Sequence, residues 1–464
     1  MANIKELAKI PERLSGGHRL CAGCGASIIV RQVLMGTKDY VVAGSATGCL
    51  EVATTIYPYT AWKIPFIHNA FENAAATMSG VETAYRALKK KGEITEEIKF
   101  VTFGGDGGTY DIGLQSLSGA LERGHKLVYV CYNNEAYMNC LSTSSMIMTE
   151  AGLKKITEVK TGEKIYAFDQ KTYKLVLKEC TGVFDNGIKD VYELSTLHHV
   201  IKATSNHPFL IAVTTEEQNT NKIICKTKNK IFTWKFLENI KIGDEVVTLK
   251  NLKSGFESEE VINIKLVGKE PTLDLRVEGE HNFIADGIVV HNTGVQRSGA
   301  TPKGASTTTA PHGKESYGKC QFKKDLTSIV AAHRIPYVAQ ASVSNWNDLV
   351  TKAEKAFKAD GPAFLNVIST CHRGWRFPQE KSIEISKLAV ETGVWPLIEV
   401  ENGVWRFTYK PKERKPVIEW LKSQGRFSHL FTEENKSIID EIQQGVDENW
   451  ARLENLCNST CKVA

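Results

Sequence analysis

The sequence lacks any apolar run long enough to cross a membrane, since no stretch approaches the roughly 18–20 residues that a transmembrane helix needs. It also lacks a strong charge bias, because a formal net charge of +5 is small for 464 residues. The composition therefore gives no support to a nucleic-acid or membrane-surface role. Residues 1–17 are charged and helical in pattern, unlike a secretory signal. Together these absences predict a cytoplasmic protein.

Low-complexity tracts and short-period repeats are missing as well. With 42% apolar and 24% charged residues, the composition is that of a soluble globular protein. The length is too great for one ordinary domain and predicts two or three. Eleven cysteines are present. In a cytoplasmic chain they favour metal, cluster or reactive-thiol chemistry over structural disulfides.

Both ends of the chain alternate short apolar strands with helix-capable segments, which is the pattern of a parallel α/β sheet covered by helices on both faces. In residues 1–139 the strands are Tyr40–Ala43, Ile98–Thr102 and Leu127–Val130, and the helices Ile28–Leu34 and Phe71–Leu88. From residue 293 the strands are Tyr337–Ala339 and Ala363–Val367, and the helix is Asn347–Phe357. The sequence therefore predicts one α/β domain in two segments, 1–139 and 293–464, the second with a C-terminal extension.

The block between them, residues 140–292, has another character. It is rich in lysine and in Asn-Gly, Thr-Gly, Glu-Gly and Asp-Gly turns, and it lacks helical periodicity. Its β-type runs are Lys164–Phe168, Val191–Leu194, Ile201–Ala203, Glu245–Leu249 and Asn282–Val290. An all-β domain is therefore predicted inside the α/β domain.

A glycine-rich loop, Gly105-Asp106-Gly107, follows the strand that ends near Thr102. Asn134 comes 28 residues after Asp106, at the end of the next strand. Small residues let backbone amides approach a diphosphate, and Mg²⁺ prefers oxygen ligands such as carboxylate and side-chain amide. The pair therefore predicts a magnesium-diphosphate site. The alternative is a glycine-rich turn and an unrelated asparagine.

Four cysteines of the α/β segments form a second constellation: Cys21 and Cys24 in a C-x-x-C pair, Cys49, and Cys371. Four thiolates can hold a [4Fe–4S] cluster or a zinc ion, and the spacing alone does not separate the two. The glycine-rich loop with Asn134 resembles the diphosphate-binding motif of thiamine-diphosphate enzymes. In such enzymes, chemistry on a 2-oxoacid releases electrons that a nearby cluster can remove one at a time, so the resemblance favours a cluster over zinc.

These features together resemble the β subunits of the 2-oxoacid:ferredoxin oxidoreductase family, in particular those acting on pyruvate. The matching stretches are HRLCAGCGASIIVRQVL, ATGCLEV, GGDGGTYDIGLQSL, YNNEAYMN joined to TGVQRSGATPKGA, and VETGVWPLIEVENG. The resemblance covers residues 1–139 and 293 to about 430. It implies a thiamine-diphosphate-binding fold and oxidative decarboxylation of pyruvate with coenzyme A to acetyl-CoA, CO₂ and reduced ferredoxin, a reaction that the family also runs in reverse.

The resemblance also implies the ligands. The cluster is expected on Cys21, Cys24, Cys49 and Cys371. Mg²⁺ is expected on Asp106, Asn134 and the Ala136 carbonyl. Thiamine diphosphate is expected along Gly105 and Gly107, with Asn139 and Thr293 beside its reactive ring. No equivalent of the family's pyrimidine-activating glutamate is found, so partners are implied: α, γ and δ subunits and ferredoxin.

The inserted block has chemically marked ends. It begins at Cys140 and closes with His291-Asn292, followed by the hydroxyl residue Thr293. Inside it, Thr204 and His207 form a T-x-x-H motif, and Asp274 and His281 lie in the last stretch. These residues resemble the hedgehog/intein (Hint) family. The block of 153 residues, which leaves 311 for the host, is too short for a homing endonuclease and is predicted to be a mini-intein.

Each residue type suits a step of protein splicing. Cys140 can attack the Asn139 carbonyl as a thiolate, with His207 and Thr204 assisting departure of the amide nitrogen. Thr293, helped by Asp274, then takes the acyl group. Asn292, assisted by His281 and His291, cyclises and cuts its own peptide bond. The alternative is an insertion that does not splice, but a permanent insertion in the cofactor loop is hard to reconcile with catalysis.

Three other functions stay open on the sequence: the same chemistry on 2-oxoisovalerate or 2-oxoglutarate, a non-redox thiamine-dependent decarboxylase or carboligase, and a zinc-bound structural protein. The remaining cysteines are predicted to have no part in the chemistry. Cys131 is expected in the core, Cys180 and Cys225 to be structural, and Cys320 incidental. Cys457 and Cys461 are expected in a mobile tail.

Overall fold

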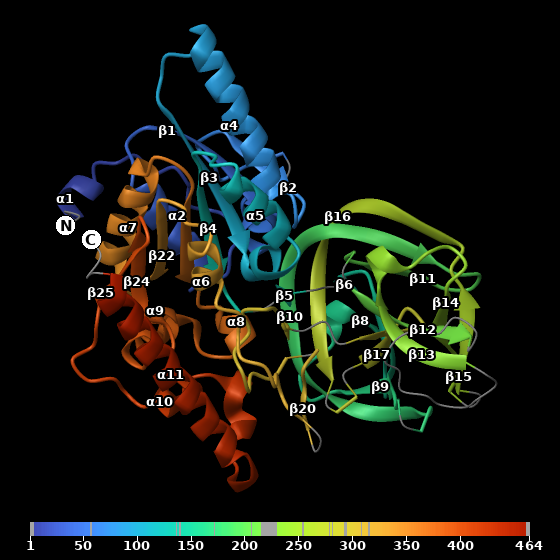
Figure 1. Ribbon diagram of the computed structural model, residues 1–464. Coiled ribbons are helices and arrows are strands. Elements are labelled where there is room, and N and C mark those ends of the chain that lie inside the picture. The colour runs from blue at the N-terminus through green and yellow to red at the C-terminus, as the bar shows by residue number, and fades with distance from the viewer. Residues whose placement is uncertain are drawn as a thin grey trace. The chain divides into compact units, whose positions relative to one another are not determined.

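In the computed structural model the described residues are 4–55, 58–135, 137–138, 141–170, 172–205, 207–214, 230–252, 255–277, 279–280, 282–291, 295–307, 309–313 and 316–460. They fold as two compact units, Met1–Ala136 with Arg297–Ala464, and Tyr137–Gln296. The first unit is α/β and the second is all β (Figure 1). No helix in these ranges is long and apolar enough to span a membrane.

The first unit is built on an eight-stranded sheet in the order β2-β1-β3-β4-β23-β22-β24-β25. Its strands are β1 (Tyr40–Ala46), β2 (Phe66–Asn69), β3 (Ile98–Gly105), β4 (Val128–Asn133), β22 (Tyr337–Ser342), β23 (Ala363–Ile368), β24 (Leu397–Glu401) and β25 (Val404–Tyr409). The six strands from β2 to β22 run parallel, while β24 and β25 form an antiparallel hairpin at the edge. The predicted parallel sheet is confirmed, and the antiparallel edge was not predicted.

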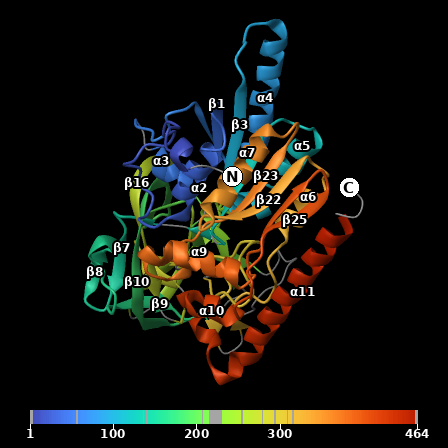
Figure 2. The same ribbon diagram turned by 90° about the vertical axis from the view of Figure 1, so that its left-hand side faces the viewer.

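Helices pack on both faces of this sheet, as Figures 1 and 2 show. One face is covered by α2 (Gly25–Leu34) and α7 (Trp346–Lys358), whose apolar residues join one core with the strands. In α2 the buried residues Ile29, Val30, Val33 and Leu34 recur at helical spacing, so that one side of the helix is apolar. The opposite core receives residues of α4, α5, α6 and α11.

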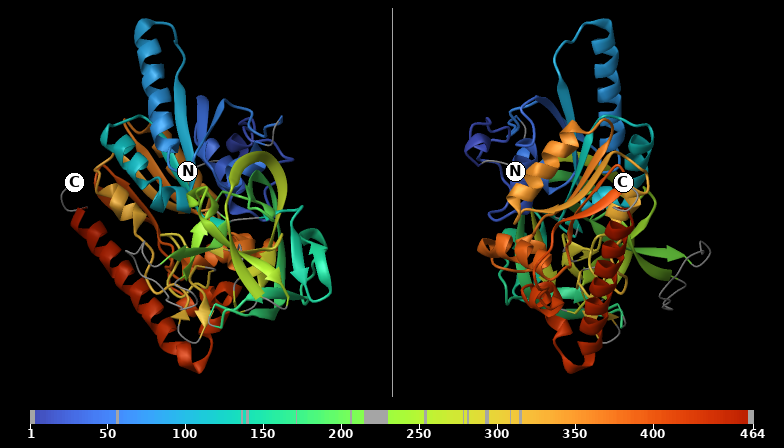
Figure 3. Two further views of the ribbon diagram at one scale, coloured as in Figure 1. Left: turned by 90° about the vertical axis from the view of Figure 1, so that its right-hand side faces the viewer. Right: turned by 60° about the vertical axis from the view of Figure 1, so that its left-hand side comes forward.

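The other helical segments complete this unit. They are α1 (Ile4–Leu7), α3 (Cys49–Thr54), α4 (Ala74–Lys91), the π-helical turn η1 (Gly107–Asp111), α5 (Leu114–Glu122), α6 (Leu326–Ala331), α8 (His372–Trp375), η5 (Gln379–Lys381), α9 (Ser382–Glu391), α10 (Val417–Lys422), η6 (Gly425–Leu430), η7 (Glu433–Asn435) and α11 (Lys436–Thr460). A short hairpin joins β20 (His312–Gly313) and β21 (Ser316–Tyr317). Figure 3 shows α11 as the long helix near the end of the chain.

In the second unit the described residues form a 13-stranded antiparallel sheet. Its strands are β6 (Leu141–Ser142), β7 (Met146–Thr149), β8 (Gly152–Lys155), β9 (Lys164–Phe168), β10 (Leu175–Ser195), β11 (Val200–Ala203), β12 (Pro208–Thr214), β13 (Lys230–Phe236), β14 (Glu245–Asn251), β15 (Gly255–Glu260), β16 (Asn263–Val277), β17 (Asn282–Ala285) and β18 (Ile288–His291), with 3₁₀ turns η2 (Ile156–Glu158) and η4 (Leu237–Asn239). The long strands β10 and β16 pair as a curved ribbon (Figure 1). A separate short ladder joins β5 (Tyr137–Met138) to β19 (Val295–Gln296).

Three expectations from the sequence were wrong in detail. The run Asn282–Val290 is two strands, because Asp286 and Gly287 both have positive φ and form a two-residue hairpin turn. The helix expected near the N-terminus covers only Ile4–Leu7. Cys457 does not lie in a mobile tail but on α11, where it packs against the apolar core.

Candidate functional site

The predicted diphosphate loop lies where two neighbouring strands of the first unit end. Asp106 follows β3 directly and caps the π-helical turn η1, and Asn134 follows β4. Because β3 and β4 are parallel and paired, with Gly105 opposite Tyr132, their carboxyl ends lie at the same edge of the sheet. The backbone N–H of Asn134 donates to Asp106 Oδ1 at 3.2 Å. The structure thus brings together the two residues that were predicted from the motif.

The Asp106 carboxyl group is buried, with 1% of the residue exposed. Burial raises its pKa to about 7, although hydrogen bonds from the Ser298 hydroxyl and the Asn134 N–H favour the charged form. Its Oδ2 atom has no hydrogen-bond partner in the described part of the chain. A buried carboxylate oxygen without a donor is costly. A divalent cation would satisfy it, so this residue fits the magnesium ligand expected here.

Glu135, the next residue, was not singled out by the sequence. It is completely buried, has φ of 62°, and its Oε2 accepts from Arg426 Nη2 at 2.5 Å. The Arg426 guanidinium in turn lies 4.1 Å above the ring of Trp375, whose indole N–H donates to the Asn134 carbonyl at 2.7 Å. A buried ion pair and an aromatic ring therefore hold Asn134 and Glu135, the first two residues after β4, in place.

Three of the four predicted cluster cysteines lie at the N-terminus of a helix. Cys24 precedes α2, Cys49 is the first residue of α3, and Cys371 caps α8, where its Sγ accepts from the Gly374 N–H at 3.3 Å. The positive end of a helix and its open N–H groups stabilise an anionic sulfur. Cys21 lies in the same C-x-x-C turn as Cys24, whose N–H donates to the Cys21 carbonyl.

These cysteines also interact electrostatically with one another. Burial raises the pKa of Cys24 to about 12, and the charges of Cys49 and Cys21 add to the effect. Burial also raises the pKa of Cys371, with contributions from the charges of the other three. Within the described ranges no three His, Cys, Asp or Glu side chains form a group that could hold a metal ion. The thiols are thus close enough for their charges to interact.

Tyr132 lies close both to Gly48, beside Cys49, and to Gly105 of the diphosphate loop. It is 1% exposed, and its hydroxyl has no hydrogen-bond partner among the described residues. Burial raises its pKa, and the charges of Cys49 and Asp106 raise it further. A Cβ on Gly48, the residue before Cys49, would lie 2.6 Å from the Tyr132 hydroxyl, so only glycine fits there. Sequence reasoning missed this residue because nothing marks it in the chain.

The second unit assembles part of the predicted splicing site through strand pairing. Leu141 on β6 pairs with Ala203 on one side and with Leu273 on the other. Thr204 and Asp274 come directly after these two partners, and both are buried. Paired strands in an antiparallel ladder run in opposite directions, so the residue that follows one member of a pair lies toward the N-terminal side of the other member. Thr204 and Asp274 are therefore brought to the N-terminal end of β6, which begins at Leu141.

His207 is also connected to this region. It is completely buried, and its backbone N–H donates to the Thr204 carbonyl at 2.9 Å. Phe209, two residues later, pairs with Val290, the residue before His291. His291 pairs with Asn282 across the β17–β18 hairpin and its ring meets Trp234 edge to face at 4.8 Å. Sheet pairing thus connects the T-x-x-H turn with the last strand of the unit.

Several predicted site residues lie outside the described residues. They are Ala136, Asn139, Cys140, His281, Asn292 and Thr293, together with Cys225 and Cys461. Of the other cysteines, Cys131 and Cys180 are fully buried and Cys320 is exposed.

The profile of the family "Thiamine pyrophosphate enzyme, C-terminal TPP binding domain" matches residues 46–211. Among solved structures, the chain is similar to a DnaB intein from Synechocystis sp. PCC 6803, at 28% identity over 33% of this chain and 98% of that one, with a TM-score of 0.28. It is also similar to the DnaX mini intein from Spirulina platensis, at 20% identity over 33% of this chain and 99% of that one, with a TM-score of 0.27.

Curated relatives match along almost the entire chain. Pyruvate synthase subunit PorB of Thermotoga maritima is 40% identical over 461 residues, covering 97% of this chain and 95% of the relative. The PorB subunit of Methanothermobacter thermautotrophicus is 37% identical, covering 94% and 98%. Ketoisovalerate oxidoreductase subunit VorB of Pyrococcus furiosus is 30% identical, covering 98% and 97%. The chain therefore belongs to the PorB family of 2-oxoacid oxidoreductase subunits.

Proposed function

We propose that the mature chain is the thiamine-diphosphate-binding β subunit of a pyruvate:ferredoxin oxidoreductase. It would convert pyruvate and coenzyme A to acetyl-CoA and CO₂, reduce ferredoxin, and run in reverse. The single observation that best supports this is the buried Asp106 carboxylate, whose free oxygen lies at the sheet edge beside Asn134. The interacting thiols and the two pyruvate synthase relatives agree with it.

The residues of the chain hold and orient the groups that do the chemistry. Thiamine diphosphate supplies stabilisation of negative charge on the carbon that loses CO₂, and a [4Fe–4S] cluster supplies one-electron transfer. Asp106, Asn134 and the Ala136 carbonyl would hold Mg²⁺, and the backbone of Gly105 and Gly107 would face the diphosphate. Asn139 and Thr293 would flank the reactive ring.

The cluster would be held by Cys21, Cys24, Cys49 and Cys371. Three of these thiolates would be stabilised by helix N-termini, which offset part of the cost of burying negative charge. Because the pyrimidine-activating glutamate has no equivalent in this chain, an α subunit would supply it, and γ and δ subunits would complete coenzyme A handling and electron transfer to ferredoxin.

Turnover of the assembled complex tests this proposal. We expect reduction of ferredoxin that depends on pyruvate, coenzyme A and thiamine diphosphate, from protein that carries iron. A complex with no iron and no thiamine diphosphate would contradict it. The VorB relative favours one alternative substrate, 2-oxoisovalerate. A kcat/KM at least about tenfold higher for 2-oxoisovalerate than for pyruvate would show that 2-oxoisovalerate is the preferred substrate, and the enzyme class would stay the same.

We also propose that the block Cys140–Asn292 excises itself. The Cys140 thiolate would attack the Asn139 carbonyl and release the amide nitrogen, which His207 protonates, so that a thioester replaces the peptide bond. The Thr293 hydroxyl would attack the thioester, taking the acyl group as an ester and returning the thiol. Asn292 would cyclise to a succinimide and release the Thr293 amine. The acyl group then moves from the Thr293 side-chain oxygen to this amine, which forms the Asn139–Thr293 peptide bond. No outside reactant is needed.

Strand register in the second unit supports this mechanism. The ladders of Leu141 end beside Thr204 and Asp274, and Cys140 is the residue that precedes Leu141 in the sequence. The pair Asn282–His291 closes the last hairpin, and His281 and Asn292 are the adjoining residues in sequence. The flanks of the block pair with each other, Met138 with Val295 and Tyr137 with Gln296.

Intact mass of the expressed protein tests splicing directly. We expect two products, of 311 and 153 residues, from the 464-residue chain. Cys140→Ala combined with Asn292→Ala should leave one chain of full length. His207→Ala should slow the first cleavage by about 100-fold or more, since it removes the proton donor for the leaving amide. A wild-type chain that stays whole would overturn the proposal.

A further inference from the structure

A tight turn, Ser298–Thr301, lies near the start of the second segment of the first unit. The backbone N–H of Ser298 donates to Thr301 Oγ1 at 2.8 Å, and the backbone N–H of Thr301 donates to the Ser298 carbonyl at 3.2 Å. The N–H of Gly299 donates to Asp111 Oδ2 at 2.9 Å. The Ser298–Thr301 turn is thus closed on itself and tied to the last residue of η1.

This turn reaches both strand ends that carry the proposed magnesium ligands. The Ser298 hydroxyl forms a hydrogen bond with the Asp106 carboxylate and favours its charged form. The Thr301 hydroxyl donates to the Glu135 carbonyl at 2.6 Å, and Glu135 follows Asn134 directly. One four-residue turn therefore places a hydroxyl on the segment after β3 and another on the segment after β4.

The Lys319 ammonium binds this turn through its backbone. It donates to the carbonyls of Ser298, Gly299 and Thr301 at 3.1, 3.4 and 2.6 Å. Lys319 and Ser298 are 5% exposed and Thr301 is 1% exposed, so water has little access to these carbonyls. Buried carbonyls need hydrogen-bond donors, and an ammonium supplies three from one atom. A single cation thus holds three carbonyls of the turn together.

The backbone of Lys319 is also fixed. Its N–H donates to the Ala305 carbonyl at 3.1 Å, and the Gly304 N–H donates to the Lys319 carbonyl at 2.8 Å. Burial lowers the pKa of Lys319 to about 8, while the charge of Glu135 opposes that change. The amine is therefore mainly protonated at pH 7 and carries all three donors.

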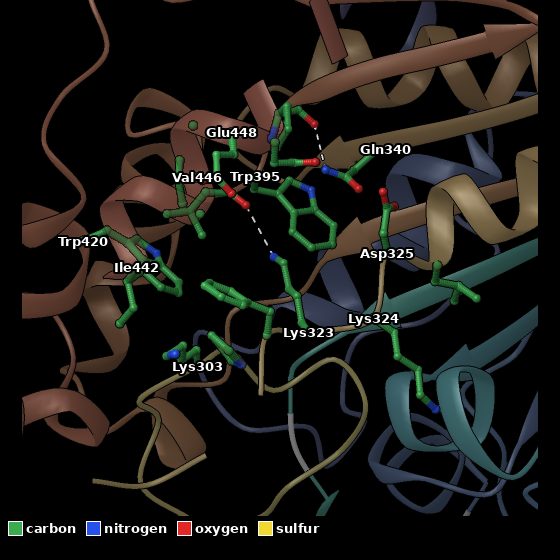
Figure 4. Close-up of a pocket in the computed structure, with 18 of the residues that line it drawn as sticks. Lys303, Lys323, Lys324, Asp325, Gln340, Trp395, Trp420, Ile442, Val446 and Glu448 are labelled. Carbon is green, nitrogen blue, oxygen red and sulfur yellow. Dashed lines mark hydrogen bonds between the residues drawn. The ribbon is translucent and has the colours of Figure 1, made fainter. Parts of the chain in front are cut away.

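Two neighbouring lysines have other partners. Figure 4 shows the side chains of Lys323 and Lys324 extending in different directions. The Lys324 amine pairs with Asp111 at 2.8 Å. The Lys323 amine donates to the Val394 carbonyl at 3.3 Å. Both side chains thus serve acceptors outside the Ser298–Thr301 turn, and they do not duplicate the contacts of Lys319.

We propose that Lys319 is a positioning residue for the magnesium-diphosphate site. Its ammonium holds the Ser298–Thr301 turn in the form that keeps both hydroxyls on the segments after β3 and β4. Asp106 is thereby kept charged, with its Oδ2 atom available to the ion. The inference rests on the function proposed above and concerns how tightly the chain binds Mg²⁺ and thiamine diphosphate.

Calorimetric titration of the assembled, cofactor-depleted complex with thiamine diphosphate and Mg²⁺ tests the inference. Lys319→Met keeps the apolar stem and removes the three donors, so it should weaken binding at least about tenfold. The matched control is Lys352→Met. Lys352 is 1% exposed, and its ammonium also donates to three oxygens, those of Gln340, Asp348 and Thr408, on β22, α7 and β25. This control should lower the thermal midpoint but change the affinity by less than about twofold.

A double variant tests whether Lys319 acts through the turn. Ser298→Ala removes the hydroxyl on Asp106 and should weaken binding a few-fold. Combined with Lys319→Met, it should weaken binding by less than the product of the two single effects, because both changes disturb the same contact. Circular dichroism confirms that each variant is folded. If Lys319→Met does not fold, Lys319→Gln, which keeps two donors on a shorter side chain, takes its place and should weaken binding several-fold.

The outcomes separate this inference from the proposed function. Wild-type affinity in the folded Lys319 variant, an equal loss of affinity in Lys352→Met, or independent effects in the double variant would each overturn the role of Lys319 and leave the proposed function intact. Absence of Mg²⁺-dependent thiamine diphosphate binding by the wild-type complex would overturn both.

Discussion

At the scale of single residues, the sequence located Asp106 and Asn134 but not the state of Asp106. The motif reveals which side chains end adjacent strands. It does not reveal that one carboxylate oxygen is buried without a partner while the other accepts from the Asn134 N–H. Such a balance depends on packing from residues far along the chain, such as Ser298. Tyr132 was missed for the same reason.

The pKa of Asp106, raised to about 7 by burial, gives a pH prediction for the metal-free protein. Between pH about 4 and 7 the folded state keeps a proton that the unfolded state has lost, so this group makes stability fall as pH rises. Asp106→Asn removes that contribution. The thermal midpoint of the variant, relative to that of the wild type, should therefore rise between pH 5 and pH 8. The variant should also lose Mg²⁺-dependent thiamine diphosphate binding. Parallel pH profiles of the two proteins would contradict this.

Cys371 gives the second residue-scale prediction. Its thiol is buried, caps α8 and feels the charges of the other three cysteines, so Cys371→Ser should remove a cluster ligand. Iron per chain and visible absorbance should fall at least about fivefold after reconstitution. The control is Cys320→Ser, an exposed thiol outside the group, which should retain the wild-type iron content. Equal iron in both variants would remove Cys371 from the site.

At the scale of elements, strands and helices with strong periodicity were predicted well. β9 has the predicted bounds, and α2, α4 and α7 differ from the predicted helices by a few residues at their ends. The β17–β18 hairpin was read as one strand because both halves are apolar, and only the Asp286-Gly287 turn separates them. In the first sheet the β24–β25 hairpin is local and turns at Asn402-Gly403, but its place beside β22 depends on pairing between distant segments, which periodicity cannot report.

The loop after β4 shows how a distant element stabilises a site. Glu135 and Arg426 are 291 residues apart in the chain and form a buried ion pair. Arg426→Met should lower the free energy of unfolding by about 3–5 kcal/mol, because it removes the close partner of the buried Glu135 carboxylate and leaves only the Lys323 amine, 3.8 Å away. Adding Glu135→Gln should recover much of this loss. Urea unfolding followed by tryptophan fluorescence measures both, and a double variant no more stable than Arg426→Met would contradict the argument.

At the scale of the whole molecule, the change of composition near residues 140 and 292 correctly predicted an all-β block inside an α/β fold. The structure divides the chain at Tyr137 and Gln296. The division falls a few residues outside the proposed splice junctions because the flanking residues form the β5–β19 ladder. Pairing between two-residue strands leaves no periodic pattern, so it could not be read from the sequence.

Excision should decide whether the first unit can bind its cofactor. The unspliced double variant, Cys140→Ala with Asn292→Ala, keeps 153 residues between Asn139 and Thr293. A displacement of about 1 Å in such a loop can cost about 100-fold in rate. We expect thiamine diphosphate to bind this precursor at least about tenfold more weakly than the spliced chain, as measured by calorimetry with Mg²⁺. Equal affinity would show that the pocket closes without splicing.

The β5–β19 ladder also bears on how cleanly the proposed excision proceeds. Since Tyr137–Met138 and Val295–Gln296 are joined by backbone hydrogen bonds, a cut at either junction leaves the severed termini tethered side by side. The effective molarity of one end toward the other then far exceeds anything set by free diffusion. Rejoining is thereby favoured over capture of the intermediate by water, and dead-end fragments should be scarce.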